Sequence, residues 1–227
     1  MITVKNLTKT YTNGEIVTPV LKGIDMDIKH GEFIAIMGKS GAGKSTLLYQ
    51  ISLLDKPTEG TINVNGIDIL NLSETERTQF RLKRLGYIFQ DYALVPELTA
   101  EENVAIPLLM QGIDSNKAKG KARHIIDSID MVGKYTNRPN QLSGGQQQRI
   151  SIARAIVQEP EILFADEPTA NLDSASSEQV IELMRDLHKK GQTIVMVTHE
   201  PEYTKYCDRI IYLEDGKIVS HDYKIST

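Results

Sequence analysis

A glycine-rich segment of the chain combines a lysine and hydroxyl side chains at a spacing that suits phosphate binding. The segment Gly38-Lys39-Ser40-Gly41-Ala42-Gly43-Lys44-Ser45 follows an apolar run at 33–37 and leads into Thr46-Leu47-Leu48. Glycines let successive backbone N–H groups point inward at phosphates, while the lysine of this pattern reaches the β- and γ-phosphates. The hydroxyl after the lysine can ligate Mg²⁺. The pattern therefore predicts a phosphate-binding loop between a buried strand and a helix, rather than a merely flexible Gly/Ser loop.

Two adjacent carboxylates follow a second apolar run. Asp166 and Glu167 come directly after residues 162–165, Ile-Leu-Phe-Ala, and are expected at the carboxyl end of a buried strand, where doubly wound sheets bind ligands. A carboxylate there can hold the Mg²⁺ shell, and a neighbouring polar group can orient water toward the γ-phosphate. We assign the metal to Asp166 and the water to Glu167. Two acids at a strand end could instead only cap the next helix, but the loop at Gly38 favours the catalytic interpretation.

A second glycine-containing segment, with two adjacent glycines, opens a predicted helix. Leu142-Ser143-Gly144-Gly145-Gln146 precedes a stretch whose apolar residues Ile150, Ala153 and Ile156 recur at helical spacing. A glycine-rich helix N-terminus offers free N–H groups and the positive end of the helix dipole, which suits an anion. Ser-Gly-Gly alone is more often a turn and a helix start. One nucleotide does not need two phosphate-binding loops. The presence of both this segment and the loop at Gly38 in one chain therefore requires an explanation.

The elements that must position these residues alternate between strands and helices. The first thirty residues predict an antiparallel layer with a turn at Asn13-Gly14, and 61–67 alternate into a second turn at Asn65-Gly66. Ser73 and Glu76 form the pattern of a capping box at a helix running through Leu82. A short buried strand at 87–89 then ends at Gln90.

From Thr99 on, the pattern becomes helical. Thr99 to Glu102 is a second capping box, and the stretch to Gly133 predicts an all-helical insertion. Strands return at 162–165, 193–197 and 210–213, separated by helices near 174–190 and 200–207. Such βαβ alternation predicts a parallel sheet. Gly191 is expected to end a helix, and Asp215-Gly216 to turn a hairpin.

Composition limits the classes of protein to which the chain can belong. The 227 residues carry a net charge of −4, which argues against nucleic-acid binding because Lys and Arg supply most of that affinity. The single cysteine, Cys207, excludes an intrachain disulfide and is expected to be a small buried residue. The start of the chain lacks the features of a signal peptide, and no apolar run approaches the roughly 18 residues of a membrane span. A partner would have to provide any membrane part.

The chain resembles the nucleotide-binding subunits of ABC transporters over essentially its whole length. Four features carry this resemblance: the loop at Gly38, the Leu-Ser-Gly-Gly-Gln segment, the Leu-Phe-Ala-Asp-Glu-Pro-Thr segment at 163–169 and a late histidine. In that family Leu-Ser-Gly-Gly-Gln is the signature motif, which reaches the γ-phosphate of ATP bound by the loop of a second subunit. The resemblance thus explains two anion sites. It implies a head-to-tail dimer with two ATP molecules sandwiched between residues 38–46 of one chain and 143–146 of the other.

Other family positions carry over one by one. Tyr11 matches the aromatic that stacks on adenine, and Gln90 matches the glutamine that contacts Mg²⁺ and the attacking water. Asp173 matches the interface loop, although it could also be only a helix N-cap. His199 matches the switch histidine at the γ-phosphate. The catalytic residues that the resemblance implies are Glu167, His199, Gln90 and Lys44. The nucleotide contacts that it implies are Tyr11, Gly38 to Thr46, Gln90, Asp166, Ser143 to Gln146 and Asp173. The implied Mg²⁺ ligands are Ser45, Gln90 and Asp166.

Departures from the family pattern are small. Lys39 stands where proline is common and Ala170 where glycine is frequent, and neither change removes a catalytic group. Glu167 is intact, which predicts ATP hydrolysis.

The resemblance also implies the fold. We expect an α/β protein with a P-loop NTPase core of the RecA-like type, a mainly parallel sheet, an antiparallel β subdomain and an inserted α-helical subdomain. The core would comprise 1–90 and 160–227, and the helical subdomain about 91–159, within one ATPase domain.

Within the family, three stretches favour the lipoprotein-releasing, macrolide-export and antimicrobial-peptide-export type: 54–60, 96–104 and 146–149. This type implies an integral membrane partner and a place at the cytoplasmic face of the membrane. ATPases of amino-acid importers and of cell-division complexes are the alternatives. A DNA-repair or translation ATPase is remote, since the chain holds one cassette and no heptads between its motifs. Cargo specificity would belong to the membrane subunit.

Overall fold

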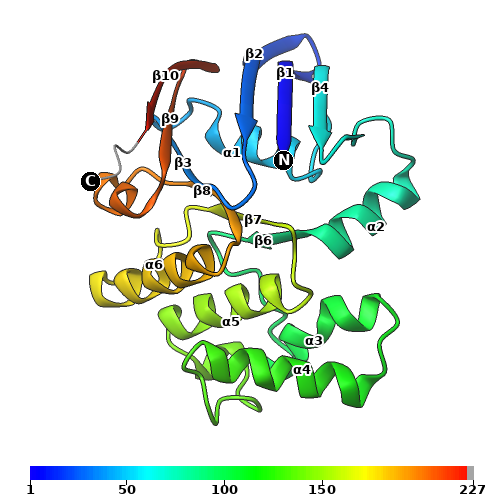
Figure 1. Cartoon of the computed structure of the whole chain (residues 1–227), viewed down its shortest axis with the longest axis vertical. Helices are drawn as coiled ribbons and strands as arrows, with labels where there is room; N and C mark the ends of the chain where they lie inside the picture. Colours follow the sequence, from blue (N-terminus) through cyan, green and yellow to red (C-terminus); the bar gives the residue numbers. More distant parts are fainter. Residues whose placement is uncertain (224–227) are drawn as a thin grey trace. The chain divides into compact units, whose positions relative to one another are not determined.

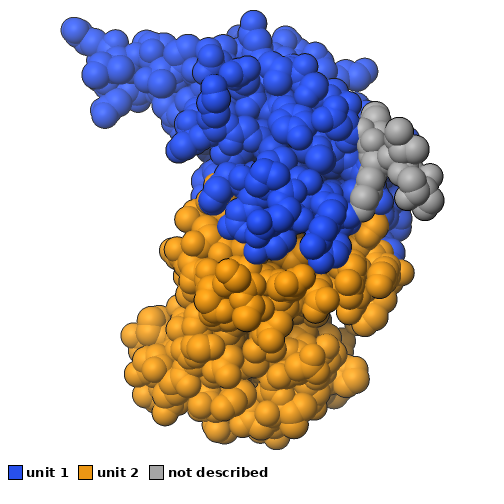
Figure 2. Space-filling view, turned by 90° about the vertical axis from the view of Figure 1, so that its left-hand side faces the viewer, with its two compact units in different colours: residues 1–79, 191–227 blue, residues 80–190 orange. Residues whose placement is uncertain are grey.

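The computed structural model describes residues 1–223, and the chain divides into two compact units (Figure 2). Unit 1 joins Met1–Gln79 to the residues from Gly191 on, and unit 2 is Phe80–Lys190. The predicted limits of the helical subdomain, about 91–159, stay a prediction.

Unit 1 contains the antiparallel layer that the alternating sequence predicts. Its strand order is β2-β1-β4-β5, and Figure 1 shows β2, β1 and β4 side by side. The bounds are β1 Ile2–Asn13, β2 Ile16–Ile28, β4 Glu59–Val64 and β5 Ile67–Asp68. Ile2 pairs with Ile28 on one side and with Val64 on the other, and all three are buried. The first turn lies one residue later than predicted, between Asn13 and Ile16. The second is as predicted, because Asn65 (φ 51°) and Gly66 (φ 83°) both have the positive φ that a tight hairpin turn requires.

Unit 1 also contains a parallel group of strands around β3 (Phe33–Met37). The neighbours of β3 are β8 (Thr193–Val197) and β9 (Arg209–Glu214), both parallel to it. Every residue of β3 and β8 is buried, as expected for strands covered on both faces. A hairpin at Asp215-Gly216 leads from β9 into antiparallel β10 (Lys217–Tyr223), as predicted.

Two helical segments of unit 1 follow the strands. α1 (Lys44–Ile51) begins directly after the glycine loop. The helix predicted near 200–207 is instead a short 3₁₀-helix, Pro201–Tyr206, which Pro201 opens. Cys207 follows it and is buried, as predicted.

A buried guanidinium fixes the starts of β3 and β9. Arg209 is 1% exposed, and its Nε lies 2.8 Å from Glu32 Oε1. Glu32 Oε2 also accepts from Lys29 N at 2.8 Å, and Asp208 Oδ2 accepts from Phe33 N at 2.8 Å. Buried charges need such pairing. These contacts join the two strand starts on the side opposite to their carboxyl ends.

Unit 2 combines a pair of parallel strands with helices. β6 (Leu85–Ile88) and β7 (Ile162–Asp166) are parallel. Its helices are α3 (Ala100–Met110), α4 (Ser115–Ser128), α5 (Gly144–Ile156) and α6 (Ser174–Lys189). Helix α2 (Glu74–Arg84) begins in unit 1, at the predicted capping box, and ends in unit 2. Helices α3, α4 and α5, green in Figure 1, share one apolar core. That core includes Val104, Leu108, Ala122, Ile126, Ile150 and Ala153. Gly112, with φ 81°, helps to break the predicted helical stretch into two helices.

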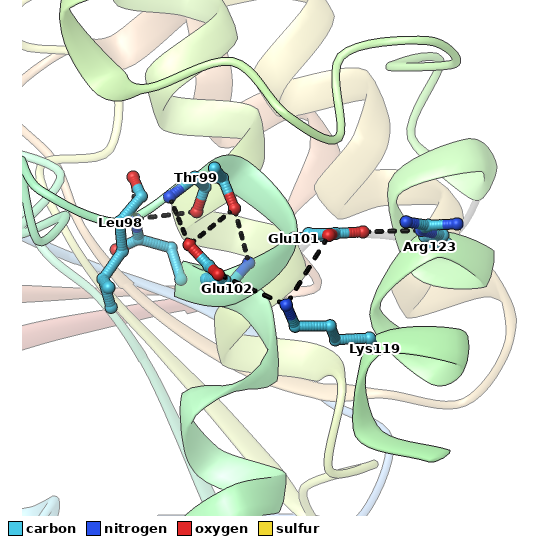
Figure 3. A network of polar contacts seen from close by, with 7 residues as sticks. Leu98, Thr99, Glu101, Glu102, Lys119 and Arg123 are labelled. Carbon is cyan, nitrogen blue, oxygen red and sulfur yellow. Dashed lines mark hydrogen bonds and ion pairs between the residues drawn. The ribbon is translucent and has the colours of Figure 1, made fainter. Parts of the chain in front are cut away.

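A polar network ties α3 to α4, as Figure 3 shows. Glu101 points toward Arg123 and pairs with it, and Lys119 contacts both Glu101 and Glu102. Thr99 caps α3: its hydroxyl accepts from Glu102 N at 3.3 Å, and Glu102 Oε2 accepts from Thr99 N at 3.0 Å. These two hydrogen bonds complete the predicted capping box. Over the described residues, no helix is both long and apolar enough to span a bilayer.

The capping box at Thr99 gives a pH-dependent prediction. Hydrogen bonds from Thr99 N and Thr99 Oγ1, and then from Lys119, hold the pKa of Glu102 below its usual 4.5. Replacing Thr99 by Ala is expected to lower the free energy of unfolding by about 1 kcal/mol at pH 7. Because the depressed pKa stabilises the fold above 4.5, this difference is expected to shrink as the pH falls through the folded-state pKa of Glu102.

Chemical denaturation at several pH values from about 3 to 7, the range in which carboxyl groups titrate, measures the difference in the free energy of unfolding between the unaltered chain and Thr99→Ala. Thr99→Ser keeps the hydroxyl and is the matched control. A Thr99→Ala loss as large at low pH as at neutral pH would contradict the role of Glu102.

Candidate active site

The glycine loop of unit 1 is shaped by close backbone approaches. Gly38 (φ 152°) and Gly43 (φ 99°) both have positive φ. A Cβ on Gly38 would lie 2.1 Å from Leu213 O, and one on Gly43 would lie 3.2 Å from Val20 O. Neither position accepts a side chain without a shift of its neighbours. No side chain caps the N-terminus of α1, which leaves this helix end suited to an anion.

Lys44 lies within this loop rather than in solvent. Its Nζ donates to Gly38 O at 3.0 Å and to Lys39 O at 3.1 Å, and the residue is 7% exposed. Lys39, by contrast, has a side chain that is 88% exposed and lies 3.7 Å from a Glu214 oxygen. The loop therefore offers the ammonium group of Lys44 and the backbone of Lys39 to a bound anion. Ser45 and Thr46 follow in the first turn of α1.

Unit 1 brings His199 to the same edge as the glycine loop. Ile36 of β3 pairs with Val197 of β8, so Gly38 and His199 each lie two residues beyond a paired position. Thr198 N donates to Ile36 O at 3.2 Å, which extends the pairing. Carboxyl ends of parallel strands are where α/β proteins bind ligands.

Tyr11 lies on β1 and is 43% exposed. Its hydroxyl donates to Asp55 Oδ2 at 3.1 Å. Partial burial, and then the Asp55 carboxylate, raise the pKa of Tyr11, while a hydrogen bond with the Thr46 side chain opposes the rise. This contact links the predicted adenine-stacking ring to the first turn of α1, beside the glycine loop.

Unit 2 brings together Gln90, Asp166 and Glu167. Ile88 of β6 pairs with Ala165 of β7, so Gln90 and Glu167 each follow two residues after a pair. Asp166 is 5% exposed, and Tyr87 Oη donates to its Oδ2 at 3.5 Å. Glu167 has φ 44°, a rare conformation for a residue with a side chain and one that occurs often at functional sites.

The predicted signature segment begins α5. Ser143 is its N-cap, and Gln146 Oε1 accepts from Ser143 N at 3.1 Å in a capping box. Gly145 packs against α6, since a Cβ there would lie 2.7 Å from Ser176 Oγ. A Cβ on Gly144 would lie 2.9 Å from the Tyr92 hydroxyl. Both glycines thus have a packing reason in addition to their predicted role at phosphate.

Asp173 is the N-cap of α6, as the alternative interpretation of the sequence allows. Its carboxylate accepts from Ser176 N at 2.9 Å and from Ser176 Oγ at 2.8 Å. These hydrogen bonds lower the pKa of Asp173, the one from the backbone of Ser176 contributing most. The side chain therefore has a structural function that does not depend on a second chain.

Sequence reasoning missed a network behind Gln90. Asn171 Nδ2 donates to Gln90 O at 3.0 Å, and Tyr92 Oη donates to Asn171 O at 3.2 Å. Arg154 of α5 donates to Tyr92 O at 2.9 Å and to Ala93 O at 2.6 Å. Tyr92 (φ 64°) and Ala93 (φ 50°) are both left-handed. Residues 91–93 include no glycine that would mark this left-handed turn in the sequence. The signal that could have revealed it is Arg154, a charged residue among the apolar positions of α5.

Hard oxygen ligands are the donors that Mg²⁺ prefers, and it usually takes one or two carboxylates together with water and phosphate. The predicted set of Ser45, Gln90 and Asp166 has this chemistry. The described residues contain no group of three or more His, Cys, Asp or Glu arranged to hold a metal by themselves. The hydroxyl, amide and carboxylate oxygens of the predicted set fit an Mg²⁺ that is bound together with nucleotide phosphates.

Comparisons with known proteins identify the family. The ABC transporter family model matches residues 21–170. The ABC transporter ATP-binding protein MJ1508 of Methanocaldococcus jannaschii is 48% identical over 96% of this chain and 98% of its own. The macrolide export ATP-binding/permease protein MacB of Marinobacter nauticus is 43% identical over 96% of this chain, which spans 34% of that protein.

A solved structure agrees with the fold. The dimeric, post-hydrolysis structure of the ATP-binding cassette MJ0796, bound to ADP and Pi, superposes with a TM-score of 0.92 at 40% identity and covers 100% of both chains. The predicted P-loop fold, with its mainly parallel sheet, antiparallel β subdomain and helices, is confirmed. The chain belongs to the ABC transporter family and is an ABC-type ATPase cassette.

Proposed function

We propose that this chain is the ATP-binding and hydrolysing subunit of an ABC transporter of the MacB-like export type. It would power extrusion of a macrolide, peptide or lipoprotein, or mechanotransmission, through a membrane subunit. The observation that carries this proposal is the 43% identity to MacB over 96% of the chain, together with an intact Lys44 and Glu167.

Each predicted site residue has a role in this proposal. Residues 38–46 bind the phosphates, with Lys44 on the β- and γ-phosphates, and Tyr11 stacks on adenine. Ser45, Gln90 and Asp166 would hold Mg²⁺, which neutralises developing charge on the phosphates when it is bound. Glu167 orients the attacking water and accepts its proton, and His199 contacts the γ-phosphate.

The proposed active form is a head-to-tail dimer. MJ0796 is dimeric in the structure that resembles this chain. In the proposal, Ser143 to Gln146 and Asp173 of one chain complete the site whose residues 38–46 belong to the other. Because ATP then binds the closed state better than the open one, its hydrolysis reopens the dimer.

The proposed location is the cytoplasmic face of a membrane, at a permease partner. MacB is named as both an ATP-binding and a permease protein. This chain spans 34% of the length of MacB, which supports a separate permease partner. An amino-acid importer or a cell-division complex would use a similar cassette and remains the second candidate, through the shared family.

Co-purification tests the proposal. Tagged Glu167→Gln protein is trapped with ATP in membranes of its own cell and extracted in mild detergent, with Lys44→Ala as the matched control that should not be trapped. We expect to recover a membrane protein with about four spanning helices and a large outer domain, each span being about 20 apolar residues. Recovery of a many-helix permease would support import instead, and no membrane protein would contradict a transporter subunit.

A further inference from the structure

The ring of Tyr11 is held by two charged neighbours within unit 1. Lys9, two residues earlier on β1, places its Nζ 4.7 Å from the centroid of the Tyr11 ring. The Tyr11 hydroxyl donates to Asp55 Oδ2 at 3.1 Å. Lys9 Nζ and Asp55 Oδ2 are themselves 2.8 Å apart. The three side chains therefore form a closed triangle of contacts, which we call the Tyr11 clamp.

Asp55 is anchored independently of Tyr11. Its Oδ1 accepts from Lys56 N at 2.7 Å, and its Oδ2 accepts from Gln50 Nε2 at 3.0 Å. Although partial burial acts in the other direction, the hydrogen bonds from Lys9, Gln50 and Lys56 lower the pKa of Asp55. The carboxylate is therefore charged near neutral pH and fixed in the loop that follows α1.

Lys9 is fixed as well. Besides Asp55, its Nζ donates to Lys56 O at 2.6 Å, and its side chain is only 12% exposed. An ammonium group within about 6 Å of a ring centroid is attracted to the face of that ring. A ring has two faces, and Lys9 occupies one of them. Tyr11 itself is 43% exposed, which leaves ring surface for a flat ligand.

We propose that Lys9 and Asp55 are positioning residues that fix the Tyr11 ring and assign the purine of ATP to the face opposite Lys9. The inference rests on the proposed function, since it needs a nucleotide bound at residues 38–46. The hydrogen bond between Tyr11 and Thr46 connects the ring to the first turn of α1, so base and phosphates would be bound by one compact unit.

The clamp predicts a loss that depends on the base. Asp55→Ala and Lys9→Ala are each expected to weaken ATP binding about 5- to 10-fold, a part of what base–aromatic stacking supplies. Inorganic triphosphate has no base, and its affinity is expected to change less than about 2-fold because the phosphate loop is untouched. Lys9→Arg keeps a cation that stacks on aromatic rings and should retain ATP affinity.

Isothermal titration of the full chain with Mg²⁺-ATP and with Mg²⁺-triphosphate measures both affinities. Lys56→Ala is the matched control, because its ammonium pairs with Glu74 and its side chain is not part of the clamp. The decisive comparison adds Tyr11→Ala: Asp55→Ala and Lys9→Ala should cost no further ATP affinity once the ring is absent, since a positioning effect needs the group that it positions.

Three outcomes would overturn the inference. They are an equal loss for ATP and triphosphate, a full Asp55→Ala loss in the Tyr11→Ala background, and unchanged ATP affinity in both clamp variants. Failure of the proposed function is distinguishable, because it is read from the membrane protein recovered by co-purification, whereas the clamp is read from the ATP and triphosphate affinities of the purified chain.

Discussion

Replacing Glu167 by Gln is expected to slow ATP hydrolysis at least about 10²-fold while ATP binding persists, since a positioned general base contributes on that scale. Gln has nearly the same shape and can still contact water, but it cannot take the proton. Glu167 directly follows β7 and the buried Asp166, and its φ of 44° fixes an uncommon direction for its side chain. A loss in turnover without a loss in affinity would be the mark of a group acting on the reacting water.

Single-turnover hydrolysis and ATP titration together test this expectation. Glu159→Gln is a suitable control, because Glu159 is an exposed acid that also has positive φ, 55°, and lies just before β7. Turnover near normal in Glu167→Gln would rule out its assigned role.

Lys44→Ala is expected to weaken ATP binding itself, by about 10- to 100-fold, because hydrogen bonds to charged groups contribute roughly 1.5–3 kcal/mol. The ammonium group is already held within the glycine loop by Gly38 O and Lys39 O. Little conformational entropy therefore has to be lost when the phosphates bind.

Equilibrium titration with Mg²⁺-ATP and with Mg²⁺-triphosphate measures the Lys44 effect. Both ligands should weaken alike, in contrast to the clamp variants, because Lys44 is assigned to phosphate. Lys56→Ala removes a lysine of unit 1 whose side chain is 62% exposed and should leave both affinities unchanged. Unchanged ATP affinity in Lys44→Ala would contradict the assignment.

Sequence reasoning performs best where local chemistry decides the structure. The capping boxes at Ser73 and Thr99, the Asn65-Gly66 turn and the buried strand before Gly38 all follow from neighbouring residues, and the structure confirms them. The outcome differs at 201–206, where a proline opens a 3₁₀-helix too short to show a reliable period.

Long-range contacts account for what the sequence did not predict. The left-handed backbone at Tyr92 and Ala93 depends on Arg154, about sixty positions later in the chain. The clamp depends on Asp55, which is 44 positions from Tyr11. Local sequence patterns predict neither the contact of Arg154 with residues 92–93 nor that of Asp55 with Tyr11. The role of Asp166 comes from its place at a strand end, and those of Gln90, Asp173, His199 and the signature residues at γ-phosphate come from family resemblance; all of them stay predictions.

The turn behind Gln90 has a consequence for how this protein can vary. The carbonyl oxygens of residues 90, 92 and 93 are each satisfied by a side chain from a distant part of unit 2. Exposed Asp91 is free to change its identity, because its side chain is not used there. An inserted or deleted residue between β6 and Gln90, however, would shift all three carbonyls away from Asn171 and Arg154 at once. This turn should therefore tolerate substitution at Asp91, whereas the spacing from β6 to Gln90 should resist any change of length.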